Sequence, residues 1–360
     1  QGMNIIIVAV DITWFFQGLE NFKKVVIRNM IVRCASIVLI FLFVKKESDL
    51  AIYMLILSGT PLVGQALIWA YLKRYLEPVA IKKINIKQHF KGIMVLFVPT
   101  IAVSIYRAFD KTMIGIFTDS SSENGYYEQA DRIVQMCITV PTALSTVMAP
   151  RIASNMAKKN IDMVNEYMYK TYEALLLIAM PLGVGIFCTS NMIVPWFLGE
   201  QYYKVITLLK IFSIIIPIIA LSNATGAQYL IQAREEKVYT KSIFLGAIVN
   251  FGLNLLMIPR IASIGAAIAS VIAEFSILFY QMLYICKKDR TLKNLWTCII
   301  SCMCMALIVV LVKPFFQPNF LGTICVAVIG ACTYGAMLLI FKEPMVCSVL
   351  DAIMGKLSRK

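Results

Sequence analysis

Three charged residues inside an apolar segment are the first chemical feature of this sequence. Residues 92–117 are mostly apolar, yet Arg107, Asp110 and Lys111 stand together near their end. Arg107 and Lys111 are four positions apart and therefore share one face of a helix. Because guanidinium and ammonium groups bind phosphate oxygens, this face is a candidate site for an anion. A structural ion pair between Arg107 and Asp110 is the alternative.

Two acidic residues occupy comparable positions in other apolar segments. Asp11 falls near the middle of residues 3–19, and Glu274 falls near the middle of residues 264–286. A charge at membrane depth costs roughly 2.5–3.5 kcal/mol on insertion scales, so such residues normally face protein or a water-filled cavity. Asp11 and Glu274 are therefore candidates to bind a coupling cation or to carry a proton.

Together these polar positions predict a central cavity that binds a cargo. Its candidate residues are Arg33, Arg107, Asp110, Lys111, Arg132, Asn250 and Asn254. The basic members favour an anionic cargo. No cofactor is predicted beyond a coupling H⁺ or Na⁺. The single histidine, His89, lies in a basic loop and nearly all ten cysteines lie in apolar segments, so the sequence predicts no metal site and no catalytic residues.

The elements that must position these residues are transmembrane helices. The chain is 59% hydrophobic and 15% charged, whereas soluble domains are about 45–50% apolar and about 25% charged. Its apolar segments have the length that crosses a hydrocarbon core of ~30 Å as a helix. The predicted fold class is therefore an all-α polytopic membrane protein. Eleven spans are predicted, at residues 3–19, 25–44, 50–72, 92–117, 128–150, 171–190, 204–231, 241–258, 264–286, 296–312 and 320–341.

The connecting segments predict the orientation in the membrane. A net charge of +14 would suggest a nucleic-acid partner in a soluble protein. Here Lys and Arg are concentrated in alternate connections, which the positive-inside rule assigns to the cytoplasm, together with the C-terminus. No nucleic-acid partner is therefore predicted. The connections on the other side are short, which disfavours an enzyme acting at the outer face.

One cytoplasmic connection has an amphipathic pattern. In residues 151–170, apolar side chains recur near helical spacing with lysines between them. This pattern predicts a helix lying in the inner membrane interface. A plain solvated loop is the alternative.

Three segments of the chain resemble the flippases that export polysaccharide repeat units. The first begins with "FDKTMIG" at Phe109, continues through "NGYYEQADRI" and ends at "APRIA". The second is "DITWFFQGLENFKKVVIRN" from Asp11, and the third is "QAREEKVYTKS" with the two asparagines that follow. These flippases form the polysaccharide-transporter branch of the multidrug/oligosaccharidyl-lipid/polysaccharide exporter superfamily.

The resemblance implies two six-helix bundles and two additional C-terminal helices. On this plan the chain begins in the fourth helix of the first bundle and lacks about three spans. The implied parts are a remnant of the first bundle (1–72), a basic cytoplasmic linker (73–91), the second bundle (92–286), two extra transmembrane helices (296–341) and a cytoplasmic tail (342–360).

The resemblance also implies a function. The expected cargo is an undecaprenyl-diphosphate-linked oligosaccharide, moved by alternating access from the inner to the outer leaflet of a bacterial cell membrane for O-antigen, capsule or related polymers. Expected partners are membrane lipid, a polymerase and other polysaccharide-assembly proteins. The alternatives are a drug/cation antiporter or a lipid II flippase of the same superfamily. A membrane-bound polysaccharide polymerase, from another class, is disfavoured because no large outer loop is predicted.

Overall fold

The structure, a computed structural model, describes residues 2–19, 21–72, 75, 86–118, 120–285 and 295–348. Within these ranges the regular elements are all helices, as the apolar composition predicts. The chain divides into two compact units, Gln1–Ile86 and Lys87–Lys360. Most of the predicted linker 73–91 and the tail beyond residue 348 lie outside the described residues, so the domain boundaries stay a prediction.

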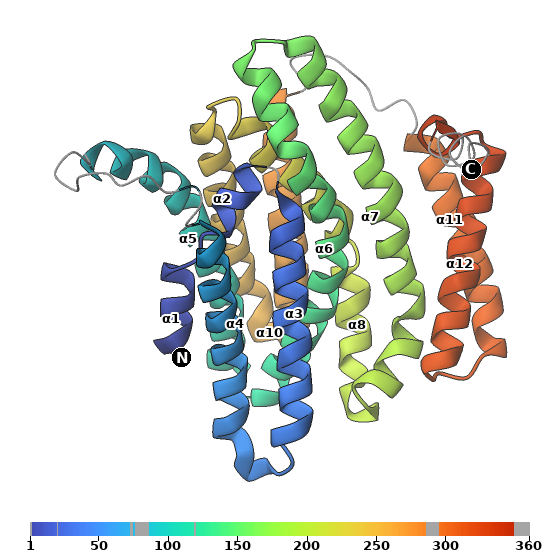
Figure 1. Ribbon diagram of the computed structural model, residues 1–360. Coiled ribbons are helices and arrows are strands. Elements are labelled where there is room, and N and C mark those ends of the chain that lie inside the picture. Colours follow the sequence, from blue (N-terminus) through green and yellow to red (C-terminus); the bar gives the residue numbers. More distant parts are fainter. Residues whose placement is uncertain are drawn as a thin grey trace, which may run out of the picture. The chain divides into compact units, whose positions relative to one another are not determined.

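The first unit contains four α-helices and a short 3₁₀ helix. They are α1 (Gly2–Ala9), α2 (Thr13–Gly18), α3 (Phe22–Phe43), η1 (Glu47–Asp49) and α4 (Leu50–Leu72) (Figure 1). The turn between α3 and α4 is closed by Asp49, whose carboxylate accepts hydrogen bonds of 2.9 Å from the backbone N–H groups of Lys45 and Lys46. The hydrogen bond from Lys45 is the main reason that the pKa of Asp49 lies below its usual range.

The first predicted span, residues 3–19, is interrupted. Helix α1 ends at Ala9 and α2 begins at Thr13. Between them, the Asp11 carboxylate accepts a 2.9 Å hydrogen bond from the backbone N–H of Thr13. A short acidic side chain that bonds the backbone two residues ahead competes with the helical ladder, which explains the break. Asp11 therefore lies at a helix break rather than in mid-helix.

The second unit contains the remaining helices. They are α5 (Ile86–Thr118), α6 (Ser121–Ala157), α7 (Ile161–Phe197), η3 (Glu200–Tyr202), α8 (Tyr203–Phe212), α9 (Ile215–Asn223), the π-helix η4 (Ala224–Leu230), α10 (Glu236–Ile285), α11 (Leu295–Val312), η6 (Lys313–Phe315) and α12 (Phe320–Ile340) (Figure 1). Side-chain caps begin two of them: Asn160 accepts a hydrogen bond from Met163 N at α7, and Asn319 accepts one from Gly322 N at α12.

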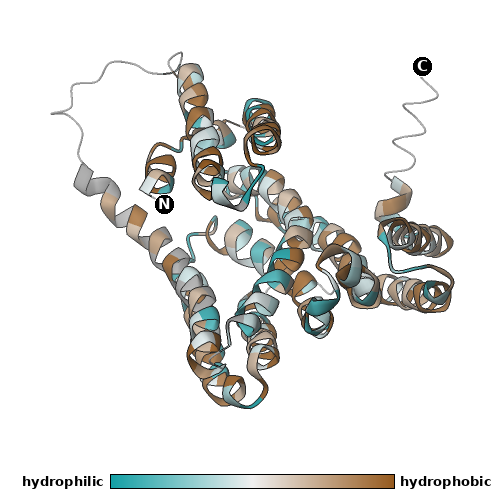
Figure 2. Ribbon diagram, turned by 90° about the horizontal axis from the view of Figure 1, so that it is seen from below, coloured by the Kyte–Doolittle hydropathy of each residue, from teal (hydrophilic) through white to brown (hydrophobic). Residues whose placement is uncertain are grey.

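The two largest apolar clusters of the described residues hold the second unit together. The larger joins side chains of α5 to α10, and the smaller packs α11 and α12 against α7. The outward faces remain apolar: Leu307 of α11 is 60% exposed and Leu321 of α12 is 70% exposed, and hydrophobic residues predominate along these helices in Figure 2. A soluble domain would bury or replace such side chains, whereas lipid solvates them.

The number of membrane-spanning helices matches the prediction only roughly. Seven helices of the described part are long and apolar enough to cross a membrane, or eight if the bent pair that meets near Ser213 is one span. Two causes account for part of the difference from eleven. The first predicted span is broken into two short helices, and two other predicted spans, 241–258 and 264–286, both lie within α10.

Helix α10 is interrupted where the sequence predicts a loop. Ile261 and Ala262 have non-helical backbone angles, and Ala262 has a φ of 51°. The chain reverses tightly here, and Gly265 packs directly against the backbone of Met257. A Cβ on Gly265 would lie only 2.6 Å from the carbonyl carbon of Met257. The two halves of α10 therefore lie side by side. Polar residues on both halves can form hydrogen bonds with the same side chain of another helix.

The prediction of an interfacial helix at residues 151–170 is wrong. Helix α6 continues to Ala157, α7 begins at Ile161, and only a short turn separates them. Ile152 and Val164, two of the apolar residues of that pattern, are fully buried in the large apolar cluster. The amphipathic spacing reflects contact with the protein core rather than with a membrane surface.

Candidate functional site

A buried carboxylate stands at the centre of the second unit. Asp110 of α5 is only 2% exposed. Its Oδ1 accepts a 2.6 Å hydrogen bond from Asn254, and its Oδ2 accepts bonds from the hydroxyls of Tyr127 (2.8 Å) and Ser270 (3.0 Å). Asn254 also donates to Asn250 at 3.1 Å. These five residues are called the Asp110 cluster.

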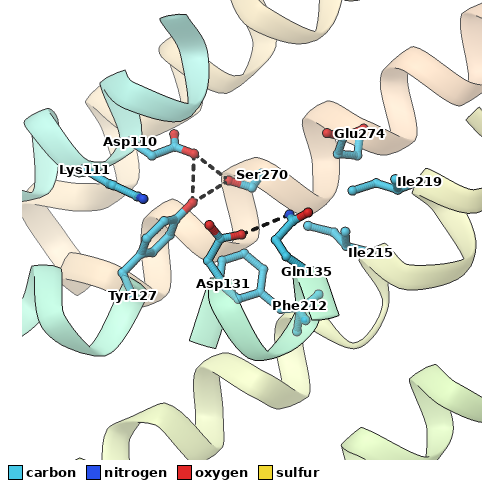
Figure 3. A pocket seen from close by; sticks show the side chains of 11 residues that line it. Asp110, Lys111, Tyr127, Asp131, Gln135, Phe212, Ile215, Ile219, Ser270 and Glu274 are labelled. Carbon is cyan, nitrogen blue, oxygen red and sulfur yellow. Dashed lines mark hydrogen bonds between the residues drawn. The ribbon is translucent and has the colours of Figure 1, made fainter. Parts of the chain in front are cut away.

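Three helices assemble this cluster. Asn250 and Asn254 lie one turn apart on the first half of α10, and Ser270 lies on the second half. The break in α10 turns the two halves toward each other, and α6 contributes Tyr127, which is 4% exposed. Figure 3 shows Asp110, Tyr127 and Ser270 joined by three hydrogen bonds. The sequence predicted Asp110, Asn250 and Asn254 as site residues, and the fold brings all three together.

The hydrogen bonds within the Asp110 cluster do not neutralise the charge of an ionised Asp110 carboxylate. Among the described residues, the hydrogen-bond donors to the Asp110 carboxylate are neutral. The Oδ1 atom of Asn254, although buried, has no hydrogen-bond partner in the described part of the chain. An isolated ionised carboxylate is expensive to bury. The site therefore suits a carboxyl group that carries a proton, or a small cation held among several oxygen atoms.

A small pocket opens beside the cluster. It has a volume of about 40 Å³, and one water molecule requires roughly 10–15 Å³. The residues that line it are Asp110, Lys111, Tyr127, Asp131, Val134, Gln135, Phe212, Ile215, Ile219, Ser270 and Glu274 (Figure 3). Three carboxylates and one ammonium group thus face a space that admits water or a small ion but no sugar. Glu274, predicted as a coupling residue, is 8% exposed here.

Two of the predicted basic residues share one acidic partner. Glu128 of α6 forms ion pairs with Lys111 of α5 and, at 2.9 Å, with Arg132 one turn further along α6. The side chains of Lys111 and Arg132 are 40% and 63% exposed, so neither is enclosed by the second unit. The single negative charge of Glu128 is therefore shared by two cations, and these three side chains together carry a net charge of about +1.

Another ion pair, between Glu123 and Lys204, lies where three helix ends meet. Glu123, in the first turn of α6, pairs with Lys204 of α8 at 2.5 Å. Its other oxygen accepts hydrogen bonds from the backbone N–H (3.2 Å) and the hydroxyl (2.6 Å) of Ser263, which follows the break in α10. Glu123 thus satisfies donors at the start of a half-helix and holds α6, α8 and α10 together.

In the first unit, Arg28 rather than the predicted Arg33 lies beside Asp11. Arg28 Nη2 donates a 3.1 Å hydrogen bond to Thr13, and both Arg28 and the buried Gln65 lie close to the Asp11 carboxylate. Arg33 is exposed on the surface of α3. The two arginines are five positions apart on one helix, so they point in different directions.

One predicted site residue, Arg107, remains, and three residues with polar contacts near the predicted ones were not predicted. Arg107 lies in α5, but its side chain is outside the described residues, so its role in binding an anion and the alternative ion pair with Asp110 both stay predictions. Sequence reasoning missed Tyr127, Glu128 and Arg28. The spacing of Glu128 four positions before Arg132 was a readable signal for their ion pair, whereas the contact of Tyr127 with Asp110 had none.

The second unit also carries an apolar groove. Its volume is about 930 Å³, and residues of α7, the α8–α9 bend and α11 line it. Phe187, Met303 and Leu307 are among the lining side chains, and polar groups are few. A groove of this size and chemistry suits a hydrocarbon chain.

Two family models match the chain. The model described as "Polysaccharide biosynthesis protein" matches residues 2–156, and the model described as MatE matches residues 91–256. The two matches overlap at α5 and α6 and together run from the first unit into α10. The resemblance to the polysaccharide transporters of the exporter superfamily is confirmed.

Curated relatives agree with this resemblance. A protein of Escherichia coli (strain K12) named "Putative O-antigen transporter" is 23% identical over 274 residues, which are 76% of this chain and 66% of that protein. A protein of the same name from Shigella dysenteriae is 22% identical and covers 76% of this chain and 68% of that protein. The chain thus spans about two thirds of the length of these relatives. Both are named as transporters, in agreement with the prediction that the chain is not an enzyme.

Solved structures of transporters share the fold. The lipid II flippase MurJ, in an inward closed conformation, matches with a TM-score of 0.64 at 16% identity, over 83% of this chain and 64% of that one. An outward-facing multidrug resistance MATE family transporter of the MOP superfamily matches with a TM-score of 0.62 at 14% identity, over 78% and 66%. The predicted exporter fold is therefore confirmed, and the chain is a multi-pass membrane protein.

Proposed function

We propose that the complete protein is a flippase of the bacterial inner membrane that moves lipid-linked oligosaccharide repeat units to the outer leaflet by alternating access. The O-antigen transporter names of the curated relatives and the polysaccharide family match support this class of cargo. We infer undecaprenyl diphosphate as the lipid carrier, a two-bundle plan with residues 92–286 as the second bundle, and a cytoplasmic C-terminus.

The Asp110 cluster is the observation that carries the proposal of coupled transport. A buried carboxylate with neutral described partners, beside an unpaired amide oxygen, suits a site that takes up and releases H⁺ or Na⁺. Asp110 therefore joins Asp11 and Glu274 as a coupling candidate. Uptake of the cation would neutralise the site and favour one packing of α5 against α10, whereas release would favour another.

The cargo is proposed to meet basic side chains and apolar surface. A diphosphate pairs well with guanidinium and ammonium groups, which Arg28, Lys111 and Arg132 supply in addition to the predicted Arg33 and Arg107. The lipid chain needs an apolar path, and the groove beside α11 is a candidate for it. Polysaccharide-assembly proteins, including a polymerase, are proposed partners.

A cation-coupled drug antiporter is the second candidate. The match of the MatE family model to residues 91–256 favours it, as does the pocket that three carboxylates line. A lipid II flippase of the same superfamily is a third possibility for the cargo. None of these candidates needs a catalytic residue.

To test the proposal, the gene is deleted in its host, and surface polymer, lipid-linked repeat units, drug susceptibility and lipid II are measured. The flippase proposal expects loss of surface polymer and accumulation of lipid-linked repeat units on the inner leaflet, with unchanged drug susceptibility. Increased drug susceptibility with normal polymer would support the antiporter instead. Accumulation of lipid II with normal polymer precursors would support the lipid II flippase.

A further inference from the structure

Three helical segments of the second unit end in the same way, and each places a basic residue in a strained backbone position. Lys159 follows α6, Arg234 follows η4 and Lys342 follows α12, with φ angles of 56°, 60° and 50°. Besides Ala262 at the break in α10, these are the non-glycine residues with positive φ in the described part of the chain.

The hydrogen bonds define each ending as a Schellman motif. After α6, Asn160 N donates to Asn155 O and Lys159 N donates to Met156 O, both at 3.0 Å. After η4, Glu235 N donates to Leu230 O at 2.8 Å and Arg234 N donates to Ile231 O at 3.1 Å. After α12, the N–H groups of Glu343 and Lys342 donate to Leu338 and Leu339 in the same pattern, both at 3.0 Å. The basic residue occupies the left-handed position of the motif every time.

Glycine is the usual residue at this position, because a Cβ disfavours left-handed backbone angles. Gly199, after α7, has a φ of 97° but a ψ of 160°, so it does not occupy this left-handed position. Figure 1 shows the connection from α7 to α8 at the lower end of the second unit, whereas the α6–α7 turn and the end of α12 lie at the upper end. Lys159 and Lys342, two of the three basic Schellman positions, thus lie at the same end of the second unit.

The three basic side chains are directed outward. Lys159, Arg234 and Lys342 are all exposed, and none belongs to an ion pair among the described residues. Glu343, the sequence neighbour of Lys342, is 1% exposed and accepts a hydrogen bond from Val346 N, so its carboxylate turns inward. None of the three lines a described pocket.

We propose that Lys159, Arg234 and Lys342 are anchors that bind the phosphate groups of anionic phospholipids at one membrane surface. A cation at the end of a helix that leaves the hydrocarbon region lies at headgroup depth, and anionic lipid attracts basic residues near the surface. The α6–α7 turn at this end belongs to one of the basic connections predicted to face the cytoplasm. Three separate helix ends, none of which lines a described pocket, fit the many headgroups of a bilayer better than the diphosphate of one cargo molecule.

The strain makes the proposal testable with glycine. The triple variant Lys159→Gly, Arg234→Gly, Lys342→Gly relieves the left-handed strain and removes the three charges. In detergent without lipid we expect its Tm to equal or exceed that of the parent chain. In nanodiscs we expect the gain in Tm from replacing phosphatidylcholine by phosphatidylglycerol to be largely lost, and headgroup affinity to fall at least about fivefold.

Two further variants serve as controls. The charge-preserving triple variant Lys159→Arg, Arg234→Lys, Lys342→Arg should retain the phosphatidylglycerol response. A double variant Lys45→Gln, Lys46→Gln, at the α3–α4 turn, removes surface charge elsewhere and should also retain it. A full phosphatidylglycerol response in the glycine variant would overturn the proposal. So would an equal gain in Tm of the parent chain from inorganic phosphate or diphosphate alone, because that result would indicate a soluble-anion site.

Discussion

Asp110 of α5 and Asn254 of α10 are 144 residues apart in the sequence and are joined by a 2.6 Å hydrogen bond in the core of the second unit. Ser270, on the other half of α10, donates to the same carboxylate. A change in the charge of Asp110 therefore acts directly on the contact between α5 and both halves of α10. Such a contact is well placed to couple cation binding to helix movement.

The first prediction concerns the charge of Asp110. Asp110→Asn keeps the size of the side chain and removes its charge, so we expect folding and membrane insertion to be retained and transport by the complete protein to fall about tenfold or more. Parent protein should also gain thermal stability from Na⁺, or show a pH-dependent Tm if the coupling ion is H⁺, and the variant should show neither response. Normal surface polymer with Asp110→Asn would contradict this assignment.

The second prediction concerns the pairing of Lys111 and Arg132. Glu128→Gln removes their shared partner. Exposed ion pairs contribute about 0–1 kcal/mol, so we expect little change in Tm. Because both cations become available, binding of a diphosphate-containing lipid should become tighter, whereas Lys111→Gln with Arg132→Gln should weaken it. Equal binding by both variants, measured in detergent, would show that these cations do not meet the cargo.

The third prediction concerns the ion pair between Glu123 and Lys204. Glu123→Gln loses this pair and weakens the bonds to Ser263, and we expect a loss of about 1–3 kcal/mol in stability. Glu166→Gln is a matched control, because Glu166 pairs with Lys170 one turn along α7 where both side chains are about half exposed. The control should lose at most about 0.5 kcal/mol. Thermal unfolding in detergent compares the two, and an equal loss would refute the role given to Glu123.

The fourth prediction concerns the packing of α3 against α4. A Cβ on Gly64 would lie 2.7 Å from Val32 Cγ2 and 3.4 Å from Arg28 Cδ. Gly64→Ala should therefore destabilise the first unit by about 1–3 kcal/mol. A Cβ on Gly59, on the same helix, would meet no neighbouring side chain within 4 Å, so Gly59→Ala should be neutral or stabilising by up to about 1 kcal/mol. Comparing the Tm of both variants checks the α3–α4 interface.

The fifth prediction separates two arginines of α3. Arg28 contacts Thr13 and lies near Asp11, whereas Arg33 is exposed. We expect Arg28→Ala in the complete protein to reduce surface polymer about tenfold or more, as loss of a cargo-binding guanidinium would, and Arg33→Ala to have the smaller effect. Immunoblots for membrane insertion control for folding. The reverse order would restore the sequence-based assignment of Arg33.

Composition and hydrophobic periodicity determined the class of this protein. Long apolar segments have no stable place in water, so helices that span a membrane are the physical consequence, and the expected exporter fold follows from motifs such as "FDKTMIG". Spacing within one helix also identified Asn250 and Asn254 as neighbours, because residues four positions apart share a face whatever the tertiary fold.

Only the tertiary structure decided which polar residues meet. The contacts of Asp110 with Asn254 and Ser270 depend on how the two halves of α10 reverse and pack, and no local spacing encodes contacts across 144 and 160 residues. The same holds for Arg28, whose reach to Thr13 depends on the break after α1. The sequence by itself determined that the chain forms helices and that lipid surrounds them. Packing between distant helices decided which partner each charged side chain has. Hydrogen bonds are short-ranged, so their geometry exists only after the chain has folded.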